Sequence, residues 1–203
     1  YNVIYILVAA LLNMVMNRIG GASDYLMQHA VTVTGLVSGL CMLVAVLPLW
    51  RMWKQELAGS TIPVAIGKKN VILCAVLALG ASLGLNSLLS VSGFAAHSET
   101  YQNVAQNQYG VAFGIGMILY GIISPFVEEV VFRGIIYNRM RRLYPVTAAI
   151  LVSGVLFGAY HGNVVQGVYG TCMGILLAYV YERTGRFWIP VGFHMLANVA
   201  VYT

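Results

Sequence analysis

Long hydrophobic stretches, separated by short polar segments, dominate the pattern of residues along this chain. Seven such stretches run over about residues 2–17, 31–50, 70–92, 109–138, 146–161, 164–182 and 187–203. About 20 helical residues cross the hydrocarbon core of a bilayer, and the second, third, fourth and sixth stretches reach that length. None alternates apolar and polar residues as the strands of a membrane β-barrel do. The pattern predicts an all-α, polytopic membrane bundle of about seven transmembrane helices.

The composition agrees with a chain that is surrounded by lipid. Hydrophobic residues make up 60% of the sequence and charged residues 8%, whereas about a quarter of the residues of a soluble domain are charged. The net charge of +5 resides in short loops, which is typical of membrane topology and argues against a nucleic-acid partner. The three cysteines, Cys41, Cys74 and Cys172, each lie in an apolar stretch, so we expect buried free thiols that pack as small hydrophobic groups.

Basic residues fall almost entirely in alternate loops. The second, fourth and sixth loops hold nine of them, namely Arg51, Lys54, Lys68, Lys69, Arg139, Arg141, Arg142, Arg183 and Arg186. The first, third and fifth loops hold only Arg18. Because cytoplasmic loops of membrane proteins are enriched in Lys and Arg, we expect the even-numbered loops and the N-terminal end in the cytoplasm and the C-terminal end outside. The polar linker 93–108 is then a solvated outer loop.

Pairs of glycines four residues apart predict close contacts between helices. Small residues at this spacing let helix backbones approach each other in lipid, either within one chain or between two copies. The pairs are Gly110/Gly114, Gly154/Gly158 and Gly170/Gly174. No internal repeat is visible in the sequence, so an inverted-repeat transporter has no support.

Two adjacent carboxylates, Glu128 and Glu129, interrupt the fourth hydrophobic stretch. A charged side chain at the centre of a bilayer costs at least about 2.5–3.5 kcal/mol, and it usually faces a partner or a cavity. Arg133 follows Glu129 by four residues, a spacing that lets the two side chains pair on one helix face. Glu128 points about 100° away and remains available for chemistry. Taken alone, a structural ion pair near the cytoplasmic interface explains both carboxylates equally well.

Histidines in two further stretches favour a functional site. His161 ends the fifth stretch, and His194 lies one helical turn before Asn198 in the last stretch. A single intramembrane histidine usually bonds one helix to another, but here three separate helices carry polar groups, and we predict one intramembrane polar cavity. At 1.5 Å per residue, His194 lies about 10 Å and His161 about 22 Å above the cytoplasmic ends of their segments. They can meet only if the helices tilt or the fifth helix begins earlier. The other two histidines, His29 and His97, fall in predicted outer loops.

These residues form three motifs that resemble those of the CAAX protease and bacteriocin-processing family of intramembrane peptidases. The motifs are E-E-x-x-x-R at Glu128, Glu129 and Arg133, F-x-x-x-H at Phe157 and His161, and H-x-x-x-N at His194 and Asn198. They occur in the family's order on separate hydrophobic stretches, and the resemblance covers about residues 120–200. It implies a helical fold whose site lies inside the bilayer and opens toward the cytoplasm, and it implies hydrolysis of peptide bonds.

The resemblance also sets our expectations for organisation and partners. We expect an integral protein of a bacterial plasma membrane whose substrate is a membrane-associated protein or peptide. Residues 1–203 would form a single membrane domain, with peripheral helices in 1–108 and a catalytic core in 109–203.

Hydrolysis of an amide requires an activated water, stabilisation of the oxyanion and a proton for the leaving amine. We predict that Glu128 is the general base and that His194 and Asn198 donate hydrogen bonds to the oxyanion. His161 would hold the water or carry a proton, while Glu129 with Arg133 would organise the helix or engage substrate. Pro125 could kink the helix and admit water, or the kink could have no catalytic meaning.

Two alternatives stay open at this point. Glu128, His161 and His194 could bind zinc as in a metalloprotease. The absence of an H-E-x-x-H motif and the poor affinity of Asn for zinc favour a mechanism without a cofactor. A non-proteolytic immunity or transport protein would also explain buried Glu and His side chains.

Overall fold

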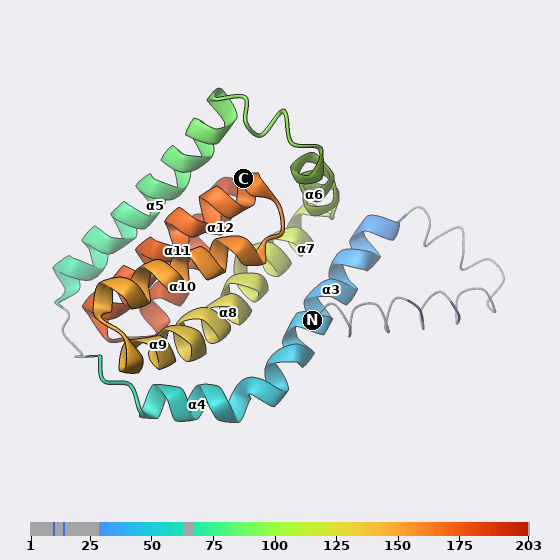
Figure 1. The fold of residues 1–203 in the computed structure, drawn as a ribbon. Coiled ribbons are helices and arrows are strands. Elements are labelled where there is room, and N and C mark those ends of the chain that lie inside the picture. The colour runs from blue at the N-terminus through green and yellow to red at the C-terminus, as the bar shows by residue number, and fades with distance from the viewer. Residues whose placement is uncertain (1–9, 11–13, 15–28, 63–66, 203) are drawn as a thin grey trace.

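The computed structural model describes residues 10, 14, 29–62 and 67–202, and within these residues all regular elements are helical (Figure 1). Apart from two positions, the first predicted stretch, 2–17, lies outside the described residues. Four described helices are long and apolar enough to cross a membrane: Ala30–Ala58, Asn70–Val91, Phe113–Leu143 and Val164–Thr184. Two shorter apolar helices cover Val146–Tyr160 and Trp188–Tyr202. These six helices match the predicted stretches, and the fold is a helical membrane bundle.

One long helical rod crosses the bundle from Phe113 to Leu143. It consists of α7 (Phe113–Ile118), the π-helical segment η2 (Leu119–Ile123), α8 (Ser124–Glu129), the π-helical segment η3 (Val130–Tyr137) and α9 (Asn138–Leu143). The other helices are α3 (Ala30–Val46), α4 (Trp50–Ala58) after a 3₁₀ turn at Leu47–Leu49, α5 (Lys68–Val91), α6 (Glu99–Tyr109), α10 (Val146–Tyr160), α11 (Val164–Thr184) and α12 (Trp188–Tyr202). π-Helical turns are rare and frequently mark functional sites, and here they flank the two adjacent carboxylates.

The linker 93–108 is not the loop that we expected, because most of it forms helix α6 (Glu99–Tyr109). The hydroxyl oxygen of Ser98 accepts a hydrogen bond from the backbone N–H of Tyr101, at 3.3 Å, and thereby caps the helix. Glu99 adds a negative charge in the first turn, which the helix dipole favours. The pair Ser98–Glu99 is a helix-start signal that the polarity of the linker concealed.

Helices α10 and α11 approach each other closely through two of the predicted glycine pairs. A Cβ atom added at Gly158 would lie 2.7 Å from the backbone nitrogen of Thr171, and one added at Gly154 would lie 2.7 Å from that of Ile175. Gly174 meets Gly154 in the same contact. The prediction is confirmed for these two pairs within one chain, whereas Gly114 faces open space.

The cysteines are free, but only Cys41 is buried. Cys74 is half-buried and Cys172 is exposed. The prediction of buried thiols is wrong for Cys172, because a helix in a membrane bundle has a lipid-facing side on which apolar sequence does not require burial.

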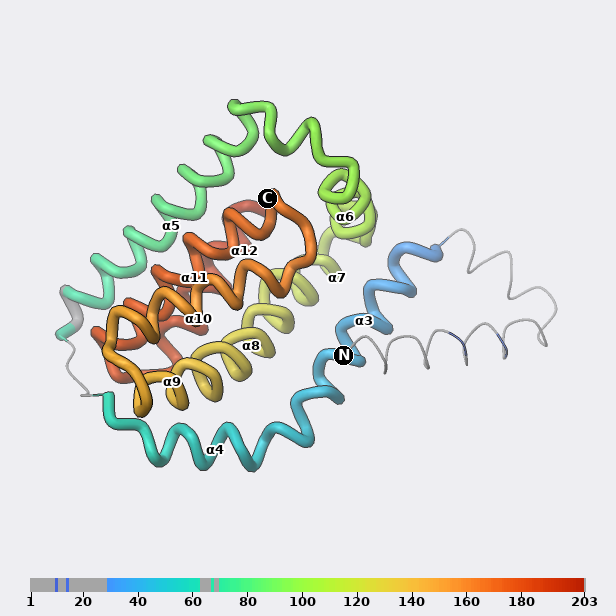
Figure 2. The backbone as a smooth tube through the Cα atoms, in the orientation of Figure 1, coloured from blue at the N-terminus to red at the C-terminus, as the bar shows by residue number. Residues whose placement is uncertain are grey.

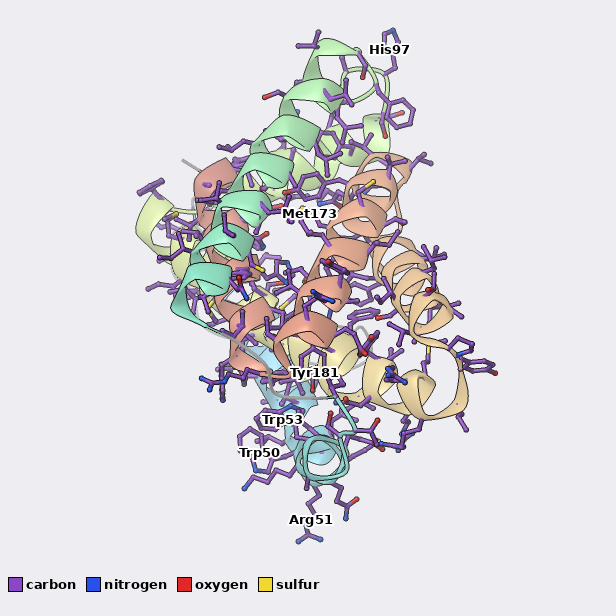
Figure 3. The ribbon with its side chains drawn as sticks, turned by 90° about the vertical axis from the view of Figure 1, so that its left-hand side faces the viewer. Trp50, Arg51, Trp53, His97, Met173 and Tyr181 are labelled. Atoms are coloured by element: carbon purple, nitrogen blue, oxygen red, sulfur yellow. The ribbon has the colours of Figure 1, made fainter. Side chains whose placement is uncertain are left out.

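The two ends of the bundle differ strongly in charge, and Figure 2 shows the helices that build them. At the basic end lie α4, α9 and the connection between α11 and α12; at the α6 end lie α6 and the C-terminus of α12 (Figure 2). Figure 3 places Arg51 at the basic end and His97 at the α6 end. Ion pairs stabilise the basic end: Glu56 binds Arg139 and Arg142, and Glu182 binds Arg141.

Hydrophobic packing is also concentrated toward the basic end. The larger core cluster there includes Trp53, Tyr137, Tyr181 and Phe187, all with at most 5% exposed surface. The ring of Trp53 lies 5.3 Å from that of Phe187. Phe126 and Val127 of α8 and Val191 and Met195 of α12 pack in or against this core.

Candidate functional site

Three helical segments carry the predicted site residues. Glu128 and Glu129 are the last two residues of α8. His161 directly follows α10, and His194 and Asn198 lie inside α12. The contacts among them divide the site into two regions. We call Glu129 and Arg133 the floor, and we call Glu128, Ser124, His161 and Asn198 the wall.

The floor is centred on Glu129, whose side chain is completely buried. Its Oε1 atom accepts a hydrogen bond from Nη1 of Arg133 at 2.7 Å and another from Nδ1 of His194 at 2.9 Å. Arg133, also completely buried, donates from Nη2 to the carbonyl of Gly174 at 2.8 Å and stacks on Phe157, with 4.7 Å to the ring centroid. The predicted Glu129–Arg133 pair is thus confirmed, and it joins α8 and η3 to α10, α11 and α12.

The wall begins with Glu128, which is buried to 9% exposure. The hydroxyl of Ser124, one turn earlier, donates a hydrogen bond of 2.6 Å to Oε1 of Glu128. The other oxygen, Oε2, lies 3.7 Å from Nε2 of His194, which is longer than a hydrogen bond. Because Nδ1 of His194 donates to Glu129, this imidazole lies between the two carboxylates and links wall to floor.

His161 joins the wall through Phe157. Its Nδ1 donates to the carbonyl of Phe157 at 2.9 Å, so in the neutral ring Nε2 carries the lone pair. The ring centroid of Phe157 lies 5.1 Å from that of His161 and 5.5 Å from that of His194. The two histidines, which we expected at different heights, therefore meet around one aromatic ring.

Asn198 makes a contact that its motif did not predict. Its Nδ2 donates to the backbone carbonyl of Tyr120 at 3.0 Å. Tyr120 belongs to the π-helical segment η2, in which a carbonyl accepts from the residue five positions later. That residue is Pro125, which has no N–H. The Asn198 side chain thus joins α12 to this turn of η2.

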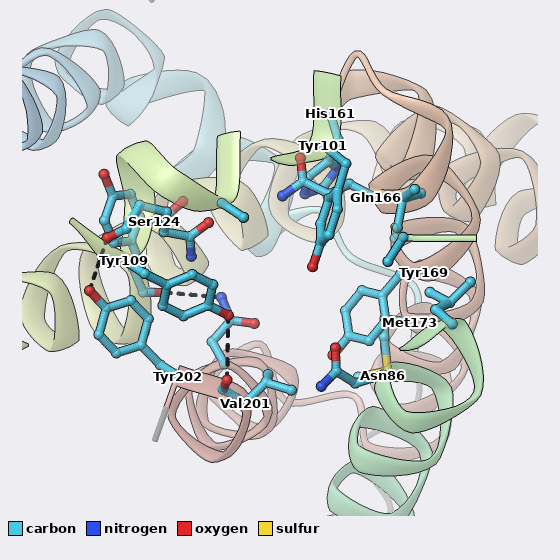
Figure 4. Close-up of a pocket in the computed structure, with 18 of the residues that line it drawn as sticks. Asn86, Tyr101, Tyr109, Ser124, His161, Gln166, Tyr169, Met173, Val201 and Tyr202 are labelled. Carbon is cyan, nitrogen blue, oxygen red and sulfur yellow. Dashed lines mark hydrogen bonds between the residues drawn. The ribbon is translucent and has the colours of Figure 1, made fainter. Parts of the chain in front are cut away.

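A cavity of about 190 Å³ connects these residues to the α6 end (Figure 4). Glu128, His161, His194 and Asn198 all line it, which confirms the predicted intramembrane polar cavity. Glu129 and Arg133 do not line it and remain beneath. Beyond the wall, apolar side chains share the lining with neutral polar groups, which include Asn86, Tyr101, Tyr109, Gln166, Tyr169 and Tyr202 (Figure 4). Sequence reasoning missed these residues and Ser124, because they belong to no motif.

The arrangement does not fit the three-ligand zinc site that the sequence left open. In the part of the chain that the structure describes, no three His, Cys, Asp or Glu side chains could hold one metal ion together. Hydrogen bonds to Glu129 and to the carbonyl of Phe157 engage the Nδ1 atoms of the two histidines, so only their Nε2 atoms could bind a metal ion. Only Glu128 and His194 face each other across a short distance.

Comparisons with known proteins point to membrane peptidases. Residues 110–200 match a family model described as "Type II CAAX prenyl endopeptidase Rce1-like". The chain is 29% identical, over 201 residues, to the "Putative membrane peptidase YdiL" of Bacillus subtilis (strain 168), with 90% of this chain and 75% of that protein covered. No solved structure shows significant similarity to the chain. The matched range contains all the residues of the floor and the wall.

Proposed function

Because the chain belongs to the CAAX protease and bacteriocin-processing family of membrane peptidases, we propose that it is an intramembrane endopeptidase in which Glu128 is the general base. The substrate would be a membrane-associated protein or peptide. The observation that carries the proposal is the position of Glu128, which faces His194 in a cavity inside an otherwise apolar bundle. Since the B. subtilis relative is a bacterial protein, the proposal places the chain in a bacterial plasma membrane.

The first step of the reaction is attack by water. Oε2 of Glu128 removes a proton from a water molecule in the cavity, and the water oxygen forms a bond with the carbonyl carbon of the substrate. The C=O electron pair moves to oxygen and gives a tetrahedral oxyanion. General-base catalysis of this kind typically contributes about 10²–10⁴-fold to the rate.

His194 and Asn198 stabilise the oxyanion. His194 can donate from Nε2 only as an imidazolium, because its neutral form keeps the proton on Nδ1 for Glu129. The carboxylate of Glu129 stabilises that positive charge through the 2.9 Å hydrogen bond. Asn198 uses one N–H for the carbonyl of Tyr120, and its second N–H remains for the substrate.

Collapse of the intermediate completes the reaction. Glu128 returns the proton to the leaving nitrogen, the C–N bond breaks, and an amine and a carboxylic acid leave the cavity. His161, whose Nε2 is free to accept a proton, lines the same cavity and can hold the water in place.

The Glu128→Gln variant tests this proposal. Cells that carry wild type, Glu128→Gln or Glu182→Gln are compared by mapping the new termini of membrane-associated peptides. Glu182 is a matched control because it lies at the basic end, bound to Arg141 and Tyr137. We expect Glu128→Gln to lower cleavage by about 10²–10⁴-fold and Glu182→Gln to retain it. Cleavage that persists in Glu128→Gln refutes the base role, and a chain that still protects cells without any cleavage favours an immunity protein.

Metal dependence is tested separately, with the purified protein. We propose a mechanism without a cofactor, supported by the lack of a three-ligand group among the described residues. Cleavage is expected to survive a zinc chelator, and metal analysis should find less than one zinc per chain. Loss of cleavage that added zinc restores would instead establish the metalloprotease alternative.

A further inference from the structure

A second hollow of the bundle, which we call the outer groove, lies apart from the cavity beside Glu128. Its volume is about 1240 Å³, and none of its lining residues also lines that cavity. Helix α11 packs against both α5 and α10, and all three helices supply the lining. On each helix the lining residues recur every three or four positions, as Leu73 and Leu77 do on α5. They therefore form one continuous stripe on each helix.

The lining of the outer groove changes from apolar to polar along its length. Leu73 of α5 and Leu151 of α10 line the apolar part, and both side chains are exposed. The polar part lies at the basic end and contains Asn70, Thr147 and Arg183. The groove thus combines a surface for a hydrocarbon chain with a group of hydrogen-bond donors.

The outer groove is about as long as one leaflet of a bilayer is thick. On α11, Cys172 and Arg183 both line it, and they are 11 positions apart, which corresponds to about 16 Å of helix. Half of the hydrocarbon core of a bilayer is about 15 Å thick. An acyl chain that enters beside Arg183 can therefore lie in the groove down to Cys172.

Arg183 gives the polar part of the groove a positive charge. Its side chain is exposed, and its guanidinium lies 6.0 Å from the ring centroid of Tyr179. Among the described residues, no carboxylate forms an ion pair with Arg183. Glu182 also lines the groove, but its carboxylate accepts hydrogen bonds from Arg141 and Tyr137. The charge of Arg183 is therefore available to a ligand.

Other features of the basic end add to this positive charge. Lys68 and Lys69 directly precede Asn70 in the sequence. Helices α5 and α10 both begin here, so the positive ends of their dipoles lie at this end. An arginine binds phosphate through two parallel hydrogen bonds, and basic pockets between transmembrane helices bind the headgroups of anionic lipids.

We propose that the outer groove binds one anionic phospholipid, with the phosphate on Arg183 and one acyl chain between α5 and α10 along α11. The proposal assigns Asn70 and Thr147 as further donors to the headgroup. It uses no step of the proposed reaction, so it stands or falls independently of the peptidase activity.

The affinity and the charge preference are tested with purified, delipidated protein in detergent micelles. The protein is titrated with phosphatidylglycerol or with phosphatidylcholine of the same acyl chains, and native mass spectrometry counts the lipids bound per chain. We expect one phosphatidylglycerol per chain and weaker binding of phosphatidylcholine. Arg183→Met should weaken the binding of phosphatidylglycerol about tenfold, because a hydrogen bond to a charged group is lost. Arg183→Lys keeps the charge and should restore most of it.

Two matched controls separate the groove from its surroundings. Arg186 is exposed at the same end of the bundle but does not line the groove, so Arg186→Met should bind phosphatidylglycerol as wild type does. Leu151→Trp fills the apolar part and should lose binding. Val152 is exposed on the same helix but does not line the groove, so Val152→Trp should keep it.

Cys172 reports where the acyl chain lies. In a chain with Cys41→Ala and Cys74→Ala, the rate at which N-ethylmaleimide alkylates Cys172 is measured with and without lipid. Phosphatidylglycerol at ten times its Kd should slow the reaction about tenfold, because the free fraction of the groove falls by that factor. Inorganic phosphate at the same concentration should leave the rate unchanged.

Several results would overturn the proposal. Equal affinity for the two lipids, or equal affinity of wild type and Arg183→Met for phosphatidylglycerol, removes the headgroup site. Unchanged alkylation of Cys172 with bound lipid places the acyl chain elsewhere, and protection by inorganic phosphate alone shows that no acyl chain is needed. A lipid-free dimer in the mass spectrum shows that a second copy of the chain covers the groove.

Discussion

Glu128 and Glu129 are neighbours in sequence, yet they lie in regions of the protein with opposite properties. Glu129 is in the floor, where Arg133 and His194 share one of its oxygens and no part of the side chain is exposed. Glu128 is in the wall, where Ser124 binds one oxygen and the other faces His194 across the cavity. A rotation of about 100° along the helix thus separates a buried, ion-paired carboxylate from one that lines the cavity.

The difference teaches how a membrane protein can keep a carboxylate at a cavity inside an apolar bundle. Arg133 balances the charge of Glu129 within the floor, so its guanidinium does not bind Glu128. Arg133 is held by Gly174 and Phe157 as well as by Glu129, which keeps it away from the cavity. The predictions that follow test this division, beginning with the largest expected effect.

Arg133→Met should destabilise the protein most. It removes the guanidinium and leaves Glu129 buried without its strongest partner, and breaking a buried pair in this way costs about 3–5 kcal/mol. The free energy of unfolding in mixed micelles is the measurement. Arg139→Met is the matched control, because its ion pair with Glu56 is half exposed and such pairs are worth about 0–1 kcal/mol. Equal stability of both variants would mean that the floor is not a charge-balancing unit.

Asn198→Ala should act on the wall, with a smaller effect on stability than on turnover. Removal of one oxyanion donor typically lowers the rate by about 10²–10³-fold, whereas loss of the bond to Tyr120 costs about 1 kcal/mol of stability. The two effects are separated by measuring cleavage of a mapped substrate and unfolding of the same preparation. If the variant loses stability but cleaves as fast as wild type, Asn198 serves only to bond α12 to the carbonyl of Tyr120.

The sequence predicted the membrane spans and the pairing of Glu129 with Arg133, because both depend on local pattern. The length of the hydrophobic stretches determines where helices can cross lipid, and the four-residue spacing of Glu129 and Arg133 determines that they pair. The convergence of His161 and His194 was predicted only from their cost in lipid. Their catalytic roles stay predictions, as does the division into peripheral and catalytic halves.

Other features depend on packing that no local pattern encodes. The contact of Asn198 with Tyr120 requires α12 to lie beside the π-helical segment η2. The exposure of Cys172 depends on which side of α11 faces lipid. The direction of the cavity depends on which ends of four helices surround it. For the same reason, α5 and α6, from the half predicted to be peripheral, supply part of the cavity lining.

Gly158→Ala should weaken the floor through the contact between α10 and α11. The added methyl group meets the backbone of Thr171, and overpacking of this kind costs about 1–3 kcal/mol. α11 also carries the Gly174 carbonyl that accepts a hydrogen bond from Arg133. A displaced α11 therefore weakens the floor, and we expect Gly158→Ala to lower the free energy of unfolding. Gly114→Ala is the control, since a methyl group there enters open space. A variant at Gly158 as stable as the Gly114 variant would show that the helices can separate without cost.

Ser124→Ala should have the smallest effect, and it tests how Glu128 is oriented. The variant removes the 2.6 Å hydrogen bond to Oε1 of Glu128, so the carboxylate can rotate away from His194. A hydrogen bond to a charged group is worth about 1.5–3 kcal/mol, part of which water in the cavity replaces, so we expect about a tenfold lower turnover. Ser124→Thr keeps the hydroxyl and should restore most of it. If the alanine and threonine variants cleave the substrate equally well, the helix alone positions Glu128. The side chains of Glu128 and Glu129 then differ only in how deeply they are buried.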